Sequence, residues 1–209
     1  MKINCIIFDC DGTLVDSEYL CNYGLEIILN QHGIVIDARQ AMSTFKGAQL
    51  KTIITSLEKQ HNFTAHNNFE KDYRKIVSDL FDAELTACTG VHEFLISNNL
   101  PRCVASSGPM EKIRRALSIT KLDQYFEKNL FSSYEIQSWK PDPALFLHAA
   151  DSMNITPAKC LVVEDSIIGV QAGCSAGMRT VLFDPYGEYS EDIWVDKISD
   201  MRELDDYLY

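Results

Sequence analysis

Asp9 and Asp11 stand two positions apart directly after the apolar run Ile3–Phe8, in the segment DCDGTLVDS. In an extended chain, side chains two positions apart project to the same side, so both carboxylates face one region. Two like charges this close are unfavourable unless a cation compensates them or one of them holds a proton. Gly12 then lets the backbone turn sharply. A lone DxDG motif is more often a solvated turn, but the apolar run before this one places the acids at the mouth of a core, where they can bind a metal or transfer a proton.

Hydroxyls and a lysine on two later segments suit a phosphate group. Ser106 and Ser107 follow a second apolar run and precede Gly108, and hydroxyls with free backbone N–H groups ahead of a helix favour an anion. Lys140 lies in the proline-flanked loop SWKPDP, whose stiffness limits the entropy lost when a long side chain is held in place. Both features have ordinary alternatives, because a serine here also caps a helix and loop lysines are usually solvated.

A second pair of acids, Glu164 and Asp165, directly follows the apolar run LVV. Adjacent carboxylates at the end of a buried strand favour a hard cation bound through oxygen, such as Mg²⁺. Asp165 or Ser166 can also cap the next helix, a role that is compatible with metal binding. Taken together, the four segments supply carboxylates for Mg²⁺ and for attack, and a lysine and hydroxyls for phosphate oxygens. This is the chemistry of phosphoryl transfer.

Four apolar runs without polar alternation predict the strands that position these residues. Such runs, separated by helical stretches, are typical of a parallel sheet covered on both faces, the doubly wound α/β pattern. In these sheets, ligands bind at the carboxyl edge of the strands. The predicted strands are Ile3–Phe8, Arg102–Ala105, Cys160–Glu164 and Thr180–Phe183, and the predicted helices are Val91–Asn98, Pro109–Ser118, Pro143–Met153 and Ile167–Ala176.

Residues 16–86 do not follow this alternation. They predict amphipathic helices without a convincing strand, at Glu18–His32, Asp37–Thr44, Leu50–His61 and Phe69–Leu85. A helical block inserted after the first strand of a parallel sheet is typical of a separate cap. We therefore expect an α/β core domain of residues 1–15 and 87–209, and a helical cap domain of residues 16–86 with hinges near Val15–Ser17 and Ala87–Gly90.

The charge balance excludes some classes of partner. The 209 residues include 30 acidic and 19 basic side chains, for a formal net charge of −11, and 46% are hydrophobic, which is enough for a core. General binding to nucleic acid or to anionic membranes needs a basic surface, so neither is expected as a partner. Nine of the acids lie in residues 183–209, so a small anionic substrate can still bind elsewhere. We expect a small phosphorylated metabolite as partner, and a monomer or weak dimer.

The seven cysteines include no CxxC pair, so neither zinc nor a dithiol redox site has support from spacing. The odd number, and the positions of Cys5, Cys103 and Cys160 in or beside apolar runs, favour buried free thiols in a reducing compartment. The N-terminal apolar stretch turns acidic too soon for a signal peptide, and no segment approaches the roughly 20 apolar residues of a membrane helix. The sequence therefore predicts a cytoplasmic protein.

The motifs together resemble a known family. The order DxDGT, serine, Lys-Pro and Glu-Asp matches motifs one to four of the haloacid dehalogenase-like (HAD) hydrolase superfamily, and the helical insert resembles its C1 cap. The resemblance covers essentially the whole chain, and its motifs are weak singly but specific jointly. It implies a Rossmann-like core with an inserted helical cap, and an Mg²⁺-dependent phosphoric monoester hydrolase.

The resemblance also implies a role for each matched residue. Asp9 would be the nucleophile that forms an aspartyl-phosphate. Asp11 would protonate the leaving alkoxide and then deprotonate the hydrolytic water. Ser106 and Lys140 would bind the transferring phosphoryl group, with Ser107 beside them.

The implied metal site uses the same acids. Asp9, the backbone carbonyl of Asp11, and Asp165 would bind Mg²⁺, while Glu164 would hold a water of the metal or ligate it directly. The four acids and Lys140 leave a net charge of −3, which Mg²⁺ changes to −1. A proton on Asp11 brings the sum to about zero, enough to admit a phosphate dianion.

Related chemistries in the superfamily fit the residues less well. Dehalogenases lack the second acid, so Asp11 argues for phosphoryl transfer, and no cap lysine matches the Schiff-base lysine of phosphonatases. Beta-phosphoglucomutase is the main alternative because its cap is also helical. Its cap histidine corresponds to Cys21 here, and Lys46-Gly47 is followed by Ala48-Gln49 where the mutase has an arginine that grips a second phosphate. Both differences disfavour a bisphosphate intermediate.

Within the superfamily, the sequence is most similar to bacterial sugar-phosphate phosphatases, particularly the 6-phosphogluconate phosphatase branch. The stretches that carry this similarity are Asp9–Ser17, Phe45–Gly47, Leu80–Leu85 and Ile136–Ala149. By analogy, Lys46 with Gly47 would bind the carboxylate or hydroxyls of the leaving group. An exposed charge at a helix end is an equally good interpretation of Lys46.

Two functions without turnover use similar residues. A receiver domain also has a phosphate-accepting aspartate, Mg²⁺ and a lysine, but it consists of about one domain without a helical insert. A sensor of phosphorylated ligands does not need Asp11 as acid and base. The intact pair Asp9 and Asp11 therefore favours an enzyme.

Overall fold

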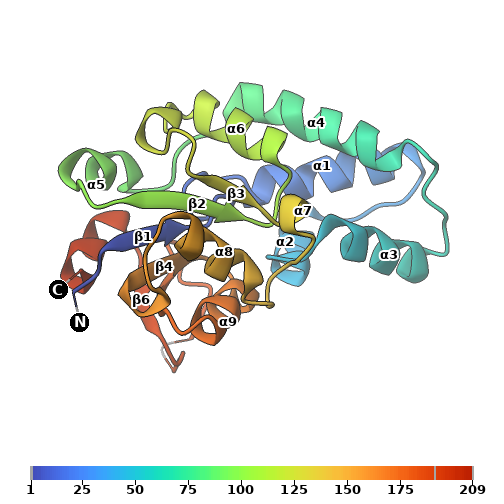
Figure 1. Ribbon diagram of the computed structural model, residues 1–209. Helices are drawn as coiled ribbons and strands as arrows, with labels where there is room; N and C mark the ends of the chain where they lie inside the picture. The colour runs from blue at the N-terminus through green and yellow to red at the C-terminus, as the bar shows by residue number, and fades with distance from the viewer. Residues whose placement is uncertain (1, 191, 209) are drawn as a thin grey trace. The chain divides into compact units, whose positions relative to one another are not determined.

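A six-stranded parallel sheet forms the first of two compact units in the computed structural model, which describes residues 2–190 and 192–208. The strand order is β3-β2-β1-β4-β5-β6 (Figure 1). The order reverses at β1, which pairs with β2 on one side and β4 on the other, so the crevice for a ligand is expected at the carboxyl end of these strands. The strands are β1 Cys5–Phe8, β2 Arg102–Ser106, β3 Leu130–Ser132, β4 Cys160–Glu164, β5 Arg179–Phe183 and β6 Asp196–Ile198.

Both faces of β1 are buried, which explains its lack of polar alternation. Cys5 and Ile7 belong to a core cluster with residues of α8 (Ala144–Ser152) and α9 (Ile167–Ser175). On the other face, the ring of Phe8 lies 6.2 Å from that of Phe94 on α5 (Val91–Ser97) and 6.0 Å from that of Phe126. Figure 1 shows α8 and α9 on one side of the sheet and α5 with α6 (Met110–Ile119) on the other.

The prediction of a doubly wound α/β fold is confirmed, and the four predicted strands lie within two residues of β1, β2, β4 and β5. Two strands, β3 and β6, were not predicted. Each has three residues and lies at an edge of the sheet, where a strand needs no continuous apolar run. The other helical segments of this first unit are α7 Ser133–Ile136 and the 3₁₀ turns η1 Asp123–Tyr125, η2 Pro157–Lys159 and η3 Met201–Tyr207.

The second compact unit comprises residues 17–85 and is entirely helical. Helix α1 packs against α2 and α4, and its Gly24 lies so close to α4 that a Cβ there would be 2.7 Å from Val77. The helices are α1 Glu18–Gln31, α2 Ala38–Phe45, α3 Leu50–His61 and α4 Phe69–Glu84. That this unit acts as a cap stays a prediction. Among the described residues, none of the helices has the length and apolar character needed to cross a bilayer.

The chain leaves and re-enters the first unit along two paired segments. Val15 forms an antiparallel bridge with Ala87, and Asp16 N donates to Thr86 O at 2.9 Å. These segments adjoin the hinges predicted from the sequence, and they bring both ends of the helical insertion together beside the turn that follows β1.

Candidate active site

The chain turns sharply directly after β1. Asp9 N donates to Val163 O at 2.9 Å, which extends the pairing with β4 and places the buried Asp9 side chain at the carboxyl edge of the sheet. Gly12 has a φ of +74°, and a Cβ at this position would lie 2.2 Å from Oδ2 of Asp165. Only glycine satisfies both the backbone conformation and the space, so Gly12 brings the two acidic segments into contact.

Lys140 joins three strand ends through its ammonium group. Nζ lies 2.5 Å from Oδ1 of Asp9 and 2.6 Å from Oε1 of Glu164, and it donates to Ala105 O at 3.0 Å. The three contacts engage all three donors, so a side chain that is 3% exposed is fully paired. The ring of Phe146 lies 4.9 Å from the ammonium. The lysine predicted to bind a phosphoryl group is therefore built into the core beside Asp9.

One lysine does not compensate the acids around it. Burial raises the pKa of Asp9 well above its usual value, and the nearby charges of Glu164 and Asp165 add to the rise while Lys140 opposes it. Burial lowers the pKa of Lys140, but the two carboxylates outweigh burial and the net shift is upward. Lys140 therefore stays charged, and the cluster keeps an excess of negative charge.

Glu164 is held on both carboxylate oxygens. Oε1 accepts from Lys140, and Oε2 accepts from the N–H of Ser166 at 3.0 Å and from its hydroxyl at 2.9 Å. Ser166 also caps α9, as predicted, because its Oγ accepts from Gly169 N at 3.2 Å. A Cβ at Gly169 would lie 1.9 to 2.2 Å from the carboxyl atoms of Glu164, so the first turn of α9 leaves space for this side chain.

Gly169→Ala is expected to destabilise the protein by about 2–4 kcal/mol, because the methyl group overlaps a buried, hydrogen-bonded carboxylate. Alanine ordinarily stabilises a helix relative to glycine. A loss of stability on this substitution therefore reports the clash with Glu164 and not helix propensity. Chemical denaturation measures it, with Gln171→Ala at an exposed position of the same helix as control. A variant as stable as the wild type would contradict this packing.

Asp165 is buried next to the turn after β1. Thr13 Oγ1 donates to Asp165 Oδ1 at 3.4 Å, and the hydroxyl of Tyr189 donates to the Asp165 carbonyl at 2.9 Å. The loop that carries Tyr189 is ordered by Asp184, whose carboxylate accepts from Tyr189 N at 3.1 Å. Sequence reasoning missed Tyr189, since a lone tyrosine after a strand carries no distinguishing pattern.

The serine loop after β2 lies beside Asp11. Ser106 is buried and its Oγ accepts from Gly108 N at 3.1 Å, whereas Ser107 is half-buried. A Cβ at Gly108 would lie 3.4 Å from Ser106 Oγ and 3.6 Å from Oδ2 of Asp11. Ser106 Oγ and the carboxylate of Asp11 therefore both lie within contact distance of the side-chain position of Gly108.

A second lysine, which sequence reasoning missed, contacts Asp11. Lys112 Nζ lies 2.8 Å from Asp11 Oδ1, and the two side chains are 24% and 19% exposed. Lys112 is in the first turn of α6, where a cation is unfavourable beside the positive end of the helix dipole. A lysine in the first turn of a helix that follows a serine loop therefore indicates that an acidic side chain lies nearby, and this pattern could have identified Lys112 from the sequence.

Lys46 and Gly47 belong to the helical unit. Lys46 follows α2, with its N–H donating to Met42 O at 3.1 Å, and Gly47 has a φ of +74°. Their role in binding substrate stays a prediction.

The acids, Lys140 and the hydroxyls at this edge of the sheet are residue types that the resemblance implies, and comparison with known proteins decides the family. A family model described as haloacid dehalogenase-like hydrolase matches residues 6–183. The chain belongs to this family. The family and the hydrolase class predicted from the motifs are confirmed.

Individual relatives agree with this HAD assignment. The 6-phosphogluconate phosphatase of Escherichia coli (strain K12) is 40% identical over 190 residues, which cover 90% of this chain and 86% of that protein. A beta-phosphoglucomutase of Bacillus subtilis (strain 168) is 29% identical over 84% of this chain and 81% of its own length. The crystal structure of a conserved haloacid dehalogenase-like protein of unknown function from Agrobacterium tumefaciens str. C58 has a TM-score of 0.84 and 27% identity, covering 98% and 97% of the two chains.

The donor atoms of this HAD hydrolase suit a hard cation. Within residues 2–190 and 192–208, no three His, Cys, Asp or Glu side chains are already gathered as a metal-binding group. Asp9 and Asp165 nevertheless lie buried at the ends of the paired strands β1 and β4, where burial and the nearby charges of Glu164, Asp165 and Asp11 raise the pKa of Asp9. Carboxylate oxygens in excess of the available cations are the chemistry that Mg²⁺ requires.

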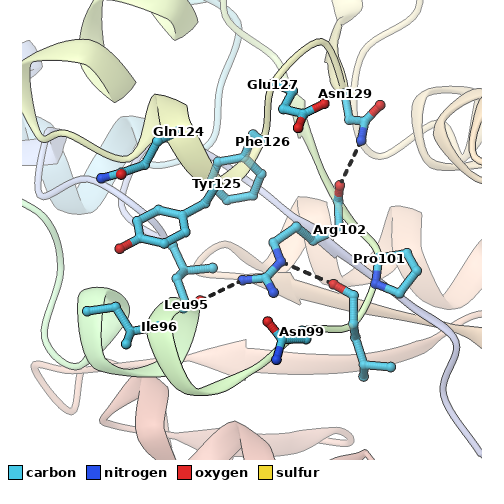
Figure 2. A pocket seen from close by; sticks show the side chains of 11 residues that line it. Leu95, Ile96, Asn99, Pro101, Arg102, Gln124, Tyr125, Phe126, Glu127 and Asn129 are labelled. Carbon is cyan, nitrogen blue, oxygen red and sulfur yellow. Dashed lines mark hydrogen bonds between the residues drawn. The ribbon is translucent and has the colours of Figure 1, made fainter.

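A separate cavity of about 600 Å³ lies at the amino ends of β2 and β3, whereas the acidic cluster lies at the carboxyl ends of the strands. Its lining includes Arg102, at the start of β2, and Asn129, before β3 (Figure 2). Arg102 donates to Leu95 O and Leu100 O, each at 3.1 Å, and to the carbonyl of Asn98. Burial lowers the pKa of its guanidinium. These bonds tie the end of α5 to the sheet, so Arg102 has a structural role away from the acidic cluster.

Proposed function

We propose that this HAD hydrolase is an Mg²⁺-dependent phosphatase that acts on a small phosphorylated sugar or sugar acid, 6-phosphogluconate foremost, through an aspartyl-phosphate on Asp9. The carrying observation is the contact of Asp9 with Lys140 at the carboxyl edge of the sheet, with Asp11 two residues further on. The 40% identity to an Escherichia coli 6-phosphogluconate phosphatase supports the substrate class.

Asp9 begins the proposed reaction. Lys140 holds Oδ1, which leaves Oδ2 to attack phosphorus in line with the leaving group. A bond forms between Oδ2 and phosphorus, the bond from phosphorus to the ester oxygen breaks, and its electron pair stays on that oxygen. The fixed carboxylate reduces the entropy that must be lost to reach the attacking geometry.

Asp11 moves the protons in both steps. As an acid it protonates the departing alkoxide, and as a base it then takes a proton from the water that attacks the phosphoryl group on Asp9. The second attack releases inorganic phosphate and regenerates the Asp9 carboxylate. One residue serves both steps because the first leaves it in the protonation state that the second requires.

Ser106, Ser107 and Lys140 bind the transferring phosphoryl group in this scheme. The Ser106 oxygen already accepts a backbone hydrogen bond, so its hydroxyl hydrogen can be donated to phosphate. Since all three donors of Lys140 are engaged, the lysine must share one of them with an incoming oxygen. Its main contribution is therefore to fix Asp9 and supply positive charge.

Asp9, Asp165 and the backbone carbonyl of Asp11 would hold Mg²⁺. When bound, the metal would supply positive charge that stabilises the negative charge of the transferring phosphoryl group. Glu164 would support the metal site indirectly and not as a ligand, because its two oxygens already accept hydrogen bonds from Lys140 and Ser166.

Phosphomutase activity is the second candidate, because the Bacillus subtilis beta-phosphoglucomutase is 29% identical to this chain. Cys21 stands at the position of the mutase histidine, and a thiol there replaces a base that the phosphomutase relies on. An assay that follows both phosphate release and sugar-phosphate isomerisation separates the two reactions. A sensor would bind the ligand and give neither.

Wild-type protein with Mg²⁺ is expected to release phosphate from 6-phosphogluconate, and Lys46→Ala to lower kcat/KM for it about tenfold more than for glucose 6-phosphate. A lost contact with the sugar-acid carboxylate of about 1.4 kcal/mol gives that factor. Lys51→Ala, at an exposed position of the same unit, is the control. An equal loss on both substrates would remove Lys46 from substrate discrimination.

A further inference from the structure

We infer that Lys112 is a positioning residue, which holds the carboxylate of Asp11 in the orientation needed for proton transfer. The inference rests on the proposed function, because it concerns the same site. Lys112 Nζ lies 2.8 Å from Asp11 Oδ1, and both side chains are partly exposed. Solvent therefore reaches both side chains, in contrast to Lys140, whose side chain is 3% exposed.

The geometry gives the two oxygens of Asp11 different neighbours. Oδ1 faces Lys112, and Oδ2 lies 3.6 Å from the point that a Cβ of Gly108 would occupy. The Cδ atom of Lys112 is 3.6 Å from the same point, and Ser106 Oγ is 3.4 Å from it. The lysine, the acid and the hydroxyl of Ser106 thus all lie around the side-chain position of Gly108.

The ammonium group beside Asp11 is that of Lys112, not that of Lys140. The three donors of Lys140 are taken by Asp9, Glu164 and Ala105, so within the described residues that lysine has none left for Asp11. An aspartate side chain has two rotatable bonds and samples several rotamers unless a partner holds it. Lys112 supplies that partner from α6, at a position where the helix dipole gives no reason for a cation.

The role predicts a dependence on the leaving group. A sugar alkoxide must be protonated as it departs, so its transfer to Asp9 depends on the orientation of Asp11. A p-nitrophenolate departs as a stable anion without that proton. Because kcat/KM reports events up to the first irreversible step, the later attack of water on the aspartyl-phosphate does not enter the comparison.

Lys112→Met is expected to lower kcat/KM for 6-phosphogluconate about 10- to 100-fold and that for p-nitrophenyl phosphate less than about twofold. The loss should lie in kcat, with KM nearly unchanged, and Lys112→Arg should recover most of it. Arg114→Met removes the same charge from an exposed position of the same helix and should change neither value. In the Asp11→Asn background, Lys112→Met should have little further effect, because its partner is gone.

Equal losses on the two substrates, or a full effect of Lys112→Met in the Asp11→Asn background, would overturn the inference while the wild-type activity stands. An increase in KM for 6-phosphogluconate alone would also overturn it, because the lysine would then bind substrate. If the wild type releases phosphate from neither substrate, the proposed function itself fails, and the inference fails with it.

Discussion

Asp9→Asn is expected to lower kcat for phosphate release at least about 10⁴-fold, because an amide is a poor nucleophile and the next acid, Asp11, is held by Lys112. The fold should survive the change. Burial and the neighbouring carboxylates raise the pKa of Asp9, so the site already disfavours a charge at this position. Calorimetry without metal should give a Tm equal to or above that of the wild type.

The expected direction of the change in Tm follows from the linkage between proton binding and folding. A carboxyl group whose pKa is higher in the folded than in the unfolded state costs stability as the pH rises above its unfolded value. A neutral asparagine removes that cost, and Lys140 keeps a carboxylate partner because Glu164 and Ala105 O still accept from it. Asp151→Asn, at an exposed position of α8, is the matched control and should change neither kcat nor Tm. Release by Asp9→Asn within tenfold of the wild type would refute the nucleophilic role.

Removal of divalent metal with EDTA is expected to reduce phosphate release to below about 1% of its starting rate, and added Mg²⁺ should restore it. The four carboxylates at this edge of the sheet outnumber Lys140 and Lys112, so a phosphate dianion is repelled until a further cation is present. The same excess predicts that Mg²⁺ raises the Tm of the wild type, since binding to the folded state stabilises it.

The thermal shift of Asp165→Asn tests magnesium binding without a measurement of activity. The substitution removes one proposed ligand, so Mg²⁺ should raise the Tm of this variant less than that of the wild type. Full phosphatase activity in EDTA-treated protein, or an equal thermal shift in the variant, would show that the acids do not form a magnesium site.

The sequence predicted the fold well where burial controls the residue pattern. The strand β1 is apolar along its whole length and β4 is apolar up to Glu164, and every residue of both strands is buried. The ends of these strands locate the two acidic segments. The edge strands β3 and β6 were not predicted, because a strand of three residues at an edge lacks that pattern. Ser166 as the cap of α9 was predicted from residue type alone and is confirmed.

The contacts within the candidate site were only partly predictable. The sequence indicates that Asp9, Lys140 and Glu164 share an edge of the sheet, but it does not reveal that every donor of Lys140 is engaged. It also misses Lys112, whose contact with Asp11 depends on where the first turn of α6 lies relative to the turn after β1.

Lys112 changes the charge balance estimated from the sequence. Four carboxylates with two lysines carry −2, which one Mg²⁺ brings to zero before the proton that Asp11 donates in the first step is counted. The sequence estimate counted only Lys140 and therefore required that proton to reach neutrality. The difference arises from a single residue on α6, three positions after the proline that precedes the helix.

The most direct test of the account is to find the phosphoryl group on Asp9. Wild-type protein mixed with 6-phosphogluconate and Mg²⁺, quenched in acid within one turnover and digested, should yield a peptide containing residue 9 that carries the mass of one phosphoryl group. Borohydride reduction should convert that acyl-phosphate to homoserine at position 9, and Asp9→Asn should give neither product. Turnover of the substrate with an unmodified residue 9, or with the phosphoryl group on another side chain, would contradict the mechanism.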